Sequence, residues 1–329
     1  MSISVSVVVP VFNCENTIVD LFHDLEAQSF TDFEVVFVDD GSRDNTLNLL
    51  KELSSRHTVK TKVISQTNAG VSAARNAGIR AAAGDCLVFV DADDRISPAF
   101  LSTLYDCMTK NDADLAIARF SMKGIDSSQN SHVYTMEEND VLLRRYLYEP
   151  KKRISIFTLM VKRELLLQNK MLFNSGHDYG EDRHFVWRLL VEAKRIACTD
   201  ANLYYYQFNP SSAMQKFSGK RFHTYKLAKR LIPFFKKKAP EFALEFEKYG
   251  PARTMWSVVW QAAIMLDWEN FQRILKDQPV RQEMRNLKGF PDLRVRLTKA
   301  LYLLSPRLYF FVIHSLRKRI ASSARGEAV

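Results

Sequence analysis

The first 120 residues alternate between short apolar runs rich in β-branched residues and stretches whose apolar residues recur at helical spacing. The runs at 4–10, 33–38, 61–65, 86–90 and 114–119 are typical of strands buried in a parallel sheet, and helices are expected between them at 17–28, 46–53, 72–83 and 98–108. This regular alternation predicts a doubly wound α/β sheet. In such sheets, ligands bind beyond the carboxyl ends of the strands.

The rest of the chain has a different pattern. Residues 121–150 are polar and lack clear periodicity, which predicts a loop or connecting excursion, and from Val141 the pattern becomes mostly helical. An aromatic run at 203–209 indicates one further strand. Beyond residue 220 helices are expected at 222–235, 240–249, 251–266, 270–276, 297–304 and 307–319, the last pair separated by Pro306. We therefore expect an α/β domain over residues 1–217 and a basic helical region over residues 218–329.

Charge is distributed unevenly between these two parts. The net charge is +10, but residues 1–217 hold 24 Lys and Arg against 28 Asp and Glu, a balance of −4. The remaining residues hold 23 basic and 9 acidic side chains, a balance of +14. Such a basic region favours an anionic partner, namely membrane lipid, nucleic acid or a polyanionic substrate. The alternative is that the basic residues simply lie on helix faces exposed to solvent.

Composition excludes several classes of protein. Hydrophobic residues make up 47% of the chain and charged residues 26%, which excludes intrinsic disorder. The apolar run near the N-terminus has no basic region before it and is not expected to be a signal peptide, and no stretch reaches the ~20 apolar residues of a membrane span. The cysteines form no CxxC pair and are expected to be reduced thiols of a cytosolic protein: Cys14, Cys86, Cys107 and Cys198.

Two motifs follow the first two predicted strands. In VVVPVFN (7–13), Pro10 lacks an N–H, so we expect strand pairing to end there and to leave a carbonyl free for a ligand. In VDDGSRDNT (38–46), Asp39 and Asp40 follow a buried strand. A carboxylate at that point can accept a hydrogen bond from a base N–H or a ribose hydroxyl, although turn chemistry alone also explains these residues.

Two further motifs lie at the third and fourth strand ends. In TNAGVSAARNAG (67–78), small residues allow the backbone to approach a ligand, and Arg75 can reach a nucleotide unless it simply faces solvent. In VFVDADDR (88–95), Asp91, Asp93 and Asp94 repel one another unless a cation or hydrogen-bond donors offset the charge. Such oxygen ligands suit Mg²⁺ or Mn²⁺ with phosphate oxygens completing the shell, and helix capping is the alternative.

A fifth motif, GHDYGEDRHFVWRLL (176–190), places two acids at the start of an apolar helix. Glu181 and Asp182 are favoured there by the helix dipole, but one of them can also act as a general base. An aspartate in solution has a pKa of about 3.9, so an aspartate is generally able to take a proton at neutral pH. His177 and His184 are alternative bases.

Together these five motifs resemble the family 2 glycosyltransferases of the GT-A fold, especially bacterial enzymes that build capsular polysaccharide or decorate wall teichoic acid. The resemblance covers roughly residues 3–215. It implies an inverting, metal-dependent hexosyl- or N-acetylhexosaminyltransferase of bacterial surface polysaccharide synthesis. Such an enzyme moves a sugar from a UDP-sugar to a hydroxyl of a glycan or lipid-linked acceptor. The region 1–217 would then be its nucleotide-sugar-binding catalytic domain.

The resemblance also implies roles for individual residues. Asp182 would be the catalytic base, with Glu181 beside it, and Asp93 with Asp91 would hold Mn²⁺ or Mg²⁺. The nucleotide-sugar site would comprise Pro10, Phe12, Asn13, Asp40, Asn68, Arg75, Asp91 and Ala92. One segment departs from the family pattern, because Gln207 stands where an arginine for the pyrophosphate is expected, and Ser211, Ser212, Lys216 and Lys220 are the candidate substitutes.

The C-terminal region suggests a location. Leu297, Leu301, Leu304, Leu308 and Phe311 recur at helical spacing among basic residues, which is typical of a helix lying on an anionic membrane. We therefore expect a cytoplasmic protein held peripherally at the inner face of the cell membrane. Packing against the catalytic domain or another subunit is the alternative, so an oligomer is left open.

Two other functions compete with the transferase interpretation. A nucleotidyltransferase on a related sheet would typically need a glycine-rich, lysine-bearing loop after the first strand, where VFNCEN has none. A non-enzymatic polyanion-binding protein is suggested by the isoelectric point of about 9.3. No nucleic-acid partner is expected, because the chain has no recognisable reader module and acidic strand ends repel phosphate.

Overall fold

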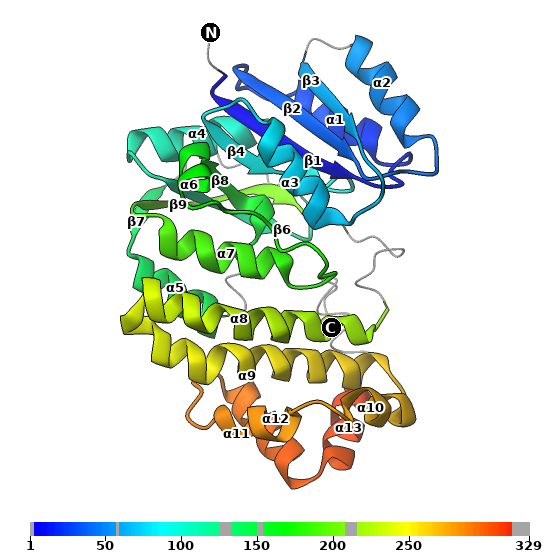
Figure 1. Ribbon diagram of the computed structural model, residues 1–329, viewed down its shortest axis with the longest axis vertical. Coiled ribbons are helices and arrows are strands. Elements are labelled where there is room, and N and C mark those ends of the chain that lie inside the picture. Colours follow the sequence, from blue (N-terminus) through cyan, green and yellow to red (C-terminus); the bar gives the residue numbers. More distant parts are fainter. Residues whose placement is uncertain (1–2, 57–58, 125–132, 150–153, 208–215, 318–329) are drawn as a thin grey trace. The chain divides into compact units, whose positions relative to one another are not determined.

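The computed structural model describes residues 3–56, 59–124, 133–149, 154–207 and 216–317 (Figure 1). The chain divides into two compact units. We call the first the sheet unit, which takes its residues from 1–142, 153–177 and 181–208. We call the second the helical unit, which takes its residues from 143–152, 178–180 and 209–329. The helical unit thus includes two short segments that precede residue 217 in the sequence.

The described strands form one mixed sheet, ordered β3-β2-β1-β4-β8-β6-β9-β5, with β7 paired to β9. β1, β2, β3 and β4 are mutually parallel, whereas β8 is antiparallel to both β4 and β6. The expected mixed α/β class is therefore confirmed. The strands are β1 (Val5–Val11), β2 (Phe33–Asp39), β3 (Lys60–Ser65), β4 (Cys86–Phe89), β5 (Arg95–Ile96), β6 (Leu115–Ser121), β7 (Tyr134–Glu137), β8 (Leu159–Lys162) and β9 (Ile196–Tyr205).

Helices cover both faces of this sheet (Figure 1). Val5, Val7 and Val9 of β1 share a core cluster with α1, whereas Val36 and Val38 of β2 cluster with Ala74 of α3. Every residue of β1 and β2 is buried, which explains their unbroken apolar runs. The helices up to residue 192 are α1 (Ile18–Glu26), α2 (Thr46–Arg56), α3 (Val71–Ala81), α4 (Phe100–Lys110), α5 (Asn139–Tyr148), η1 (Ile156–Thr158), α6 (Arg163–Gln168) and α7 (Glu181–Glu192).

Three strands lie where the sequence pattern did not predict them. β5 is a two-residue strand between an expected strand and an expected helix, β7 falls within the expected loop at 121–150, and β8 falls within a segment expected to be helical. β9 also begins at Ile196, earlier than the aromatic run at 203–209 indicates. Strands of four residues are too short to show a period, and β8 is stabilised by its two neighbours, β4 and β6.

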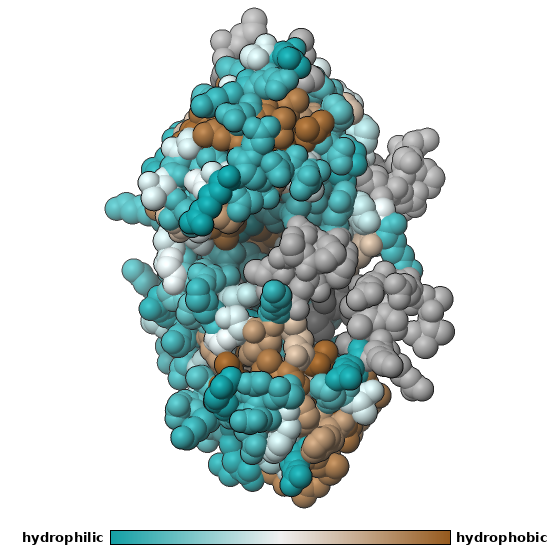
Figure 2. Space-filling view, turned by 90° about the vertical axis from the view of Figure 1, so that its right-hand side faces the viewer, coloured by the Kyte–Doolittle hydropathy of each residue, from teal (hydrophilic) through white to brown (hydrophobic). Residues whose placement is uncertain are grey.

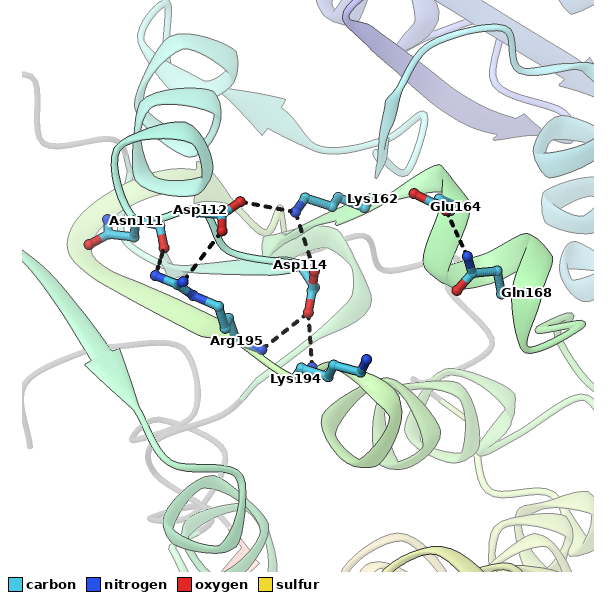
Figure 3. A network of polar contacts seen from close by, with 8 residues as sticks. All are labelled: Asn111, Asp112, Asp114, Lys162, Glu164, Gln168, Lys194 and Arg195. Atoms are coloured by element: carbon cyan, nitrogen blue, oxygen red, sulfur yellow. Dashed lines mark hydrogen bonds and ion pairs between the residues drawn. The ribbon is translucent and has the colours of Figure 1, made fainter.

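A network of charges joins three strands at the amino edge of β4 and β6 (Figure 3). Asp114 Oδ1 lies 3.3 Å from Lys162 Nζ, and Asp114 Oδ2 accepts hydrogen bonds from the backbone N–H groups of Lys194 (3.0 Å) and Arg195 (3.2 Å). Lys162 and Arg195 also pair with the exposed Asp112. Exposed ion pairs contribute little each, so the backbone N–H bonds to the Asp114 carboxylate are the stronger part of this network, beside the backbone ladder between β6 and β9.

The helical unit has a core of its own, in which Phe222, Met255 and Tyr309 are buried. α9 runs unbroken through Gly250 and Pro251, although two helices were expected there. Both residues are buried with their neighbours, so packing on the two sides of the proline outweighs the loss of one backbone hydrogen bond. The helices are η3 (Gly219–Arg221), α8 (Phe222–Lys238), α9 (Pro240–Met265), α10 (Trp268–Leu275), α11 (Val280–Asn286), α12 (Leu293–Leu304) and α13 (Pro306–Ser315).

None of the helices in the described ranges combines the length and the apolar character that crossing a bilayer requires. The four cysteines are free thiols, and Cys86 and Cys107 are buried. The expectation of unpaired cysteines is therefore confirmed.

Gly78 of α3 provides a test of helix–sheet packing. A β-carbon at Gly78 would lie 2.2 Å from Val8 Cγ1 of β1, so the helix rests directly on the strand. Gly→Ala inside a helix normally stabilises by about 0.5–1 kcal/mol. We expect Gly78→Ala instead to lower the free energy of unfolding by about 1–3 kcal/mol, measured by urea denaturation, because the added methyl overpacks the contact. Adding Val8→Ala should restore part of the loss, and a Gly78→Ala protein as stable as wild type would contradict this packing.

Candidate functional site

The carboxyl ends of β1, β2 and β4 carry most of the site residues expected from the sequence. Because these strands are parallel neighbours, their carboxyl ends lie at one edge of the sheet unit. Phe12 and Asn13 follow β1, Asp40 follows β2, and the acidic turn 91–94 follows β4. The fold therefore brings the first, second and fourth motifs to a common edge.

Asp40 is buried and holds the loop between β3 and α3. Its Oδ1 accepts hydrogen bonds from Gln66 Nε2 (2.7 Å) and the Ala69 N–H (2.9 Å), and its Oδ2 accepts one from the Gly70 N–H (2.8 Å). The exposed Asn68 donates from Nδ2 to the Asp40 carbonyl oxygen at 2.8 Å. A carboxylate offers about four acceptor positions. Asp40 thus fixes the third motif and keeps capacity for one more donor.

Pro10 does not end strand β1, and this expectation was wrong. The strand continues to Val11, and Pro10 pairs in register with Val38 of β2. Even-numbered residues of β1 bond towards β4, as the hydrogen bond from the Val90 N–H to the Val8 carbonyl shows. The missing N–H of Pro10 therefore falls where β4 has already ended, and the β1–β2 ladder loses no bond.

Phe12 and Asn13 form the turn that follows β1. Phe12 is 45% exposed, which is unusual for a large aromatic side chain next to a buried strand. Asn13 has a φ of +52°, and its Oδ1 accepts a hydrogen bond from the Arg43 N–H at 2.8 Å. Its own N–H donates to Ser42 Oγ at 3.0 Å. These bonds tie the turns after β1 and β2 together and leave the Phe12 ring open to a ligand.

Arg75 links three of the motifs. It lies within the first turns of α3 and is only 4% exposed, so the alternative of a solvent-facing arginine was wrong. Its Nη2 is 2.8 Å from Asp91 Oδ1, and its Nη1 is 3.5 Å from Glu181 Oε1. The guanidinium also lies 5.3 Å from the centre of the Phe173 ring. One buried cation thus joins α3, the acidic turn after β4 and the start of α7.

Tyr204 of β9 organises the acidic turn. Its hydroxyl donates to Asp94 Oδ2 (2.7 Å) and accepts from the Asp91 N–H (3.1 Å), and its ring stacks on Phe157 at 4.4 Å. Burial, with the charges of Asp91 and Asp93, raises the pKa of Asp94 to about 8. Asp94 is therefore an interior group that holds the turn, and sequence reasoning missed both its role and that of Tyr204. The aromatic run at 203–209 was the available signal.

Asp91 and Asp93 remain as the carboxylates that could hold a metal ion. The Asp91 side chain is 28% exposed and Asp93 is partly buried, while Ala92 between them is buried. Burial raises the pKa of Cys14 to about 11, and the nearby Asp93 charge adds to the rise, so Asp93 lies close to the turn after β1. In the described ranges no group of three His, Cys, Asp or Glu side chains could hold a metal ion. Two carboxylates still fit Mg²⁺ or Mn²⁺, which commonly take one or two protein carboxylates and complete the shell with phosphate and water.

The two acids of the fifth motif differ in environment. Glu181 is 8% exposed, and burial together with the Asp182 charge raises its pKa to about 7, while Arg75 acts in the opposite direction. Asp182 is partly exposed, and its Oδ1 accepts a hydrogen bond from the Arg183 N–H at 2.6 Å. Near neutral pH Glu181 is thus partly protonated. Asp182 is the acid of the pair that solvent can reach.

Within the helical unit, residues 178–180 contact η3 and the first residues of α8. Lys220 Nζ pairs with Asp178 Oδ2, and the Asp178 N–H donates to His223 Nδ1 at 3.3 Å. Gly180 has a φ of +87°, and a β-carbon there would lie 2.7 Å from Thr224 Cα. Only glycine fits that position, which sequence reasoning did not single out.

The segment that departs from the family pattern is described in part. The Gln207 N–H donates to Asp94 Oδ1 at 2.9 Å, so this residue anchors the end of β9 to the acidic turn. Lys220 is engaged with Asp178, and the Lys216 carbonyl accepts a hydrogen bond from Arg221 Nη2. Ser211 and Ser212 lie outside the described residues. The residue that would contact a pyrophosphate therefore stays a matter of prediction.

A pocket of about 250 Å³ lies at the opposite, amino edge of β4. Its walls include none of the site residues expected from the sequence, and they mix both signs of charge: Asp85, Cys86, Tyr105, Met108, Thr109, Asp112, Ala113 and Lys162. We assign the site to the carboxyl edge instead, because the converging carboxylates and the buried arginine are found there.

Residues 6–176, more than half of the chain, match the sequence profile of the family described as Glycosyl transferase family 2. This chain belongs to glycosyl transferase family 2. The family expected from the five motifs is thus confirmed. Neither the nucleotidyltransferase nor the non-enzymatic interpretation is supported.

Three known proteins are similar to this chain in sequence or in structure. It is 31% identical to the uncharacterized glycosyltransferase EpsJ of Bacillus subtilis over 216 residues, which are 63% of this chain and 62% of EpsJ. The chain therefore spans less than two thirds of the length of that relative. The crystal structure of S. aureus TarS 1-349 with UDP-GlcNAc is 22% identical, with a TM-score of 0.64 over 98% of this chain and 92% of that one. A mannosyltransferase of Pyrobaculum calidifontis, in complex with GDP-Man and Mn²⁺, is 16% identical, with a TM-score of 0.56 over 95% and 86%.

These structural likenesses show a shared fold. The mixed sheet and the helical C-terminal region agree with the TarS structure, so the expected GT-A type fold is confirmed. The roles of single residues stay predictions. What the structure adds is their arrangement: Asp40 is bonded to the third motif, and Arg75 joins the third motif to the fourth and fifth.

Tyr204 provides a test of the acidic turn. We expect Tyr204→Phe to lower the free energy of unfolding by about 1–3 kcal/mol, because the buried Asp94 carboxyl and the Asp91 N–H both lose a partner. Tyr205→Phe is the matched control, since its side chain points to the opposite face of β9. Urea denaturation measures both variants, and equal stabilities would show that Tyr204 does not hold the turn.

Proposed function

We propose that this glycosyltransferase moves a sugar from a UDP-sugar to a hydroxyl of a glycan or lipid-linked acceptor, with inversion at the anomeric carbon, in the synthesis of bacterial surface polysaccharide. Residues 1–217 would form the catalytic domain and residues 218–329 a basic helical region. The observation that carries the proposal is the pairing of Arg75 with both Asp91 and Glu181. This pairing gathers carboxylates from separate motifs at the edge where an α/β sheet binds ligands.

The nucleotide site is proposed at the turns after β1 and β2. The spare acceptor capacity of Asp40 suits a uracil N–H, with Pro10 beside it, and the exposed ring of Phe12 offers a surface for stacking near Asn13. Asn68 is exposed on the loop that Asp40 holds. The TarS structure, which contains UDP-GlcNAc, supports a uridine donor over a guanosine one.

Arg75 is proposed as a further nucleotide contact. Its Nη1 is paired by charge with Glu181, yet neither Nε nor Nη1 has a hydrogen-bond acceptor in the described ranges of the chain. Buried donors of this kind are normally satisfied, so an oxygen of the donor substrate is a fitting partner. Asp91, which pairs with Arg75, and the adjacent Ala92 would contact the same substrate.

A divalent ion is proposed between the chain and the donor diphosphate. Asp93 and Asp91 would hold Mn²⁺ or Mg²⁺, and the ion would offset negative charge on the leaving diphosphate. The mannosyltransferase structure, which is a complex with Mn²⁺ as well as GDP-Man, supports this choice. Arg75 limits the repulsion between Asp91 and its acidic neighbours, and Tyr204 with Gln207 holds Asp94 away from the ligand set.

Asp182 is proposed as the general base. It accepts the proton of the acceptor hydroxyl while the hydroxyl oxygen bonds to the anomeric carbon and the bond from that carbon to the diphosphate oxygen breaks. Attack from the face opposite the leaving group inverts the anomeric configuration. Glu181, with a pKa of about 7, is partly protonated near neutral pH and is suited to donating a hydrogen bond to donor or acceptor.

The acceptor chemistry suggests a location. We propose that the enzyme is cytoplasmic and acts peripherally at the inner face of the cell membrane, where a lipid-linked glycan acceptor would be anchored. The excess of 14 positive charges beyond residue 217 supports attraction to an anionic surface.

Removing the proposed base should separate binding from transfer. We expect Asp182→Asn to bind UDP and Mn²⁺ as wild type does but to lose about 10²- to 10⁴-fold in kcat, because the amide cannot accept the proton. Sugar transfer from labelled UDP-GlcNAc measures the loss. Glu192→Gln, at the other end of α7, is the matched control and should keep activity. Turnover of Asp182→Asn within a few-fold of wild type would exclude Asp182 as the base.

Removing the proposed metal ligand should abolish the metal dependence of donor binding. Calorimetric titration of UDP, with Mn²⁺ and with a chelator, should show a marked gain from Mn²⁺ in wild type. That gain should be absent in Asp93→Ala, because a single remaining carboxylate holds the ion poorly. Asp85→Asn, just before the amino end of β4, is the control and should keep the gain. An unchanged Mn²⁺ dependence in Asp93→Ala would place the metal elsewhere.

A further inference from the structure

The last two described helices expose a row of large apolar side chains. On α12, Leu293, Leu297 and Leu304 are 60%, 62% and 78% exposed, at a spacing of four and seven residues that keeps them on one side of the helix. On α13, Leu308, Phe311 and Val312 are 46%, 51% and 38% exposed, and Leu316, the residue just after this helix, is 37% exposed. We call these seven residues the leucine face.

The leucine face is not needed to pack the helical unit. Other residues of the same helices do that, because Val295, Tyr302, Tyr309, Phe310 and Ile313 are buried in the unit's core. A surface helix ordinarily places polar residues on the side away from its core. Figure 2 shows apolar surface at the lower end of the view, where Figure 1 places α12 and α13. These two helices thus present a second apolar side to the outside.

The surroundings of the leucine face are positively charged. Residues 293–317 contain no Asp or Glu, and they contain five basic residues: Arg294, Arg296, Lys299, Arg307 and Arg317. Asp292, which precedes α12, pairs with Arg294 and so balances one of these charges. Partial burial lowers the pKa of Lys299, and the positive charges of Arg296 and Lys288 add to this effect. The local potential is therefore positive around an apolar surface.

An exposed apolar surface surrounded by basic residues fits one kind of partner best. Nucleic acid would match the charge but offers no apolar surface for seven exposed side chains. In a two-fold dimer the leucine face would meet its own copy, and the flanking arginines would then approach one another. An anionic bilayer matches both properties, because its headgroups attract the basic residues while leucine and phenylalanine enter the boundary with the acyl chains.

We infer that the leucine face of α12 and α13 docks on the headgroup region of a bilayer that contains anionic lipid. The inference refines the peripheral location proposed above, but it stands on these residues alone and needs no catalytic role. Docking of this kind is reversible and shallow, because the apolar side chains enter only the boundary between headgroups and acyl chains.

Vesicle binding by the full-length protein tests this inference. Co-sedimentation is compared between vesicles of phosphatidylcholine alone and vesicles that also contain phosphatidylglycerol, at low and at raised salt. We expect binding to the anionic vesicles to be about tenfold stronger and to weaken as salt rises, because the basic residues lose their attraction. Equal binding to both vesicles, or to neither, would overturn the inference.

Variants separate the two components of the face. Leu297→Ser with Phe311→Ser should weaken binding to anionic vesicles about tenfold. Arg296→Gln with Arg307→Gln should reduce the salt dependence, because two of the five basic residues around the face are neutralised. Leu244→Ser on α9 is the matched control, because Leu244 is 79% exposed and outside the face. All of these side chains are exposed, so thermal unfolding should be unchanged. A normal affinity in the serine pair would disprove docking through this face.

Two further measurements distinguish membrane docking from dimer formation and from a failure of the proposed function. If sedimentation velocity shows a dimer that the serine pair dissociates, the face belongs to a second copy and the membrane inference fails. Transfer to a soluble acceptor should be unaffected in the serine pair, since these residues lie outside the proposed catalytic machinery. If the serine pair loses vesicle binding but keeps normal sugar transfer, the inference is supported. If the wild-type protein shows no sugar transfer, the proposed function is refuted, and the vesicle result is unchanged.

Discussion

Arg75 is a buried cation between two carboxylates, and the carboxyl edge of the sheet unit is organised around it. Asp91 and Glu181 come from different strand and helix ends, and without a shared cation their charges would repel. Removing one partner of a buried pair typically costs about 3–5 kcal/mol, because an uncompensated charge remains inside. The same pairing leaves two donors of Arg75 without a hydrogen-bond acceptor among the described residues, and the proposed substrate contact would use them.

A second set of contacts gives neighbouring acidic side chains different environments. Tyr204 and the Gln207 N–H draw Asp94 into the interior, so that three adjacent aspartates do not act as one cluster. Burial likewise separates Glu181 from Asp182, which share a helix turn but differ in exposure. The proposed role of each carboxyl group, as metal ligand, general base or structural support, therefore follows from its burial and hydrogen bonds more than from its residue type.

The sequence alone predicted the alternating strands and helices of the first 120 residues, because buried parallel strands and amphipathic helices each impose a period that is visible in one dimension. It also predicted the family, since five motifs occur in the family's order along the chain. It did not predict β7, β8 or the continuity of α9 through Pro251. Short strands show no period, and the cost of a helical proline is outweighed only by packing on both sides of it.

What the sequence determined is thus the set of candidate residues and the order of the elements that carry them. What only the tertiary structure decided is which of them meet. Arg75 and Glu181 are separated by more than a hundred residues, and no local pattern indicates that they pair. The same holds for Asp94 with Tyr204, and for Asp40, whose bonds go to the loop before α3. The reason is physical: hydrogen bonds and ion pairs depend on positions in space, which the packing of the whole sheet sets, whereas periodicity reports only whether a side chain faces the core.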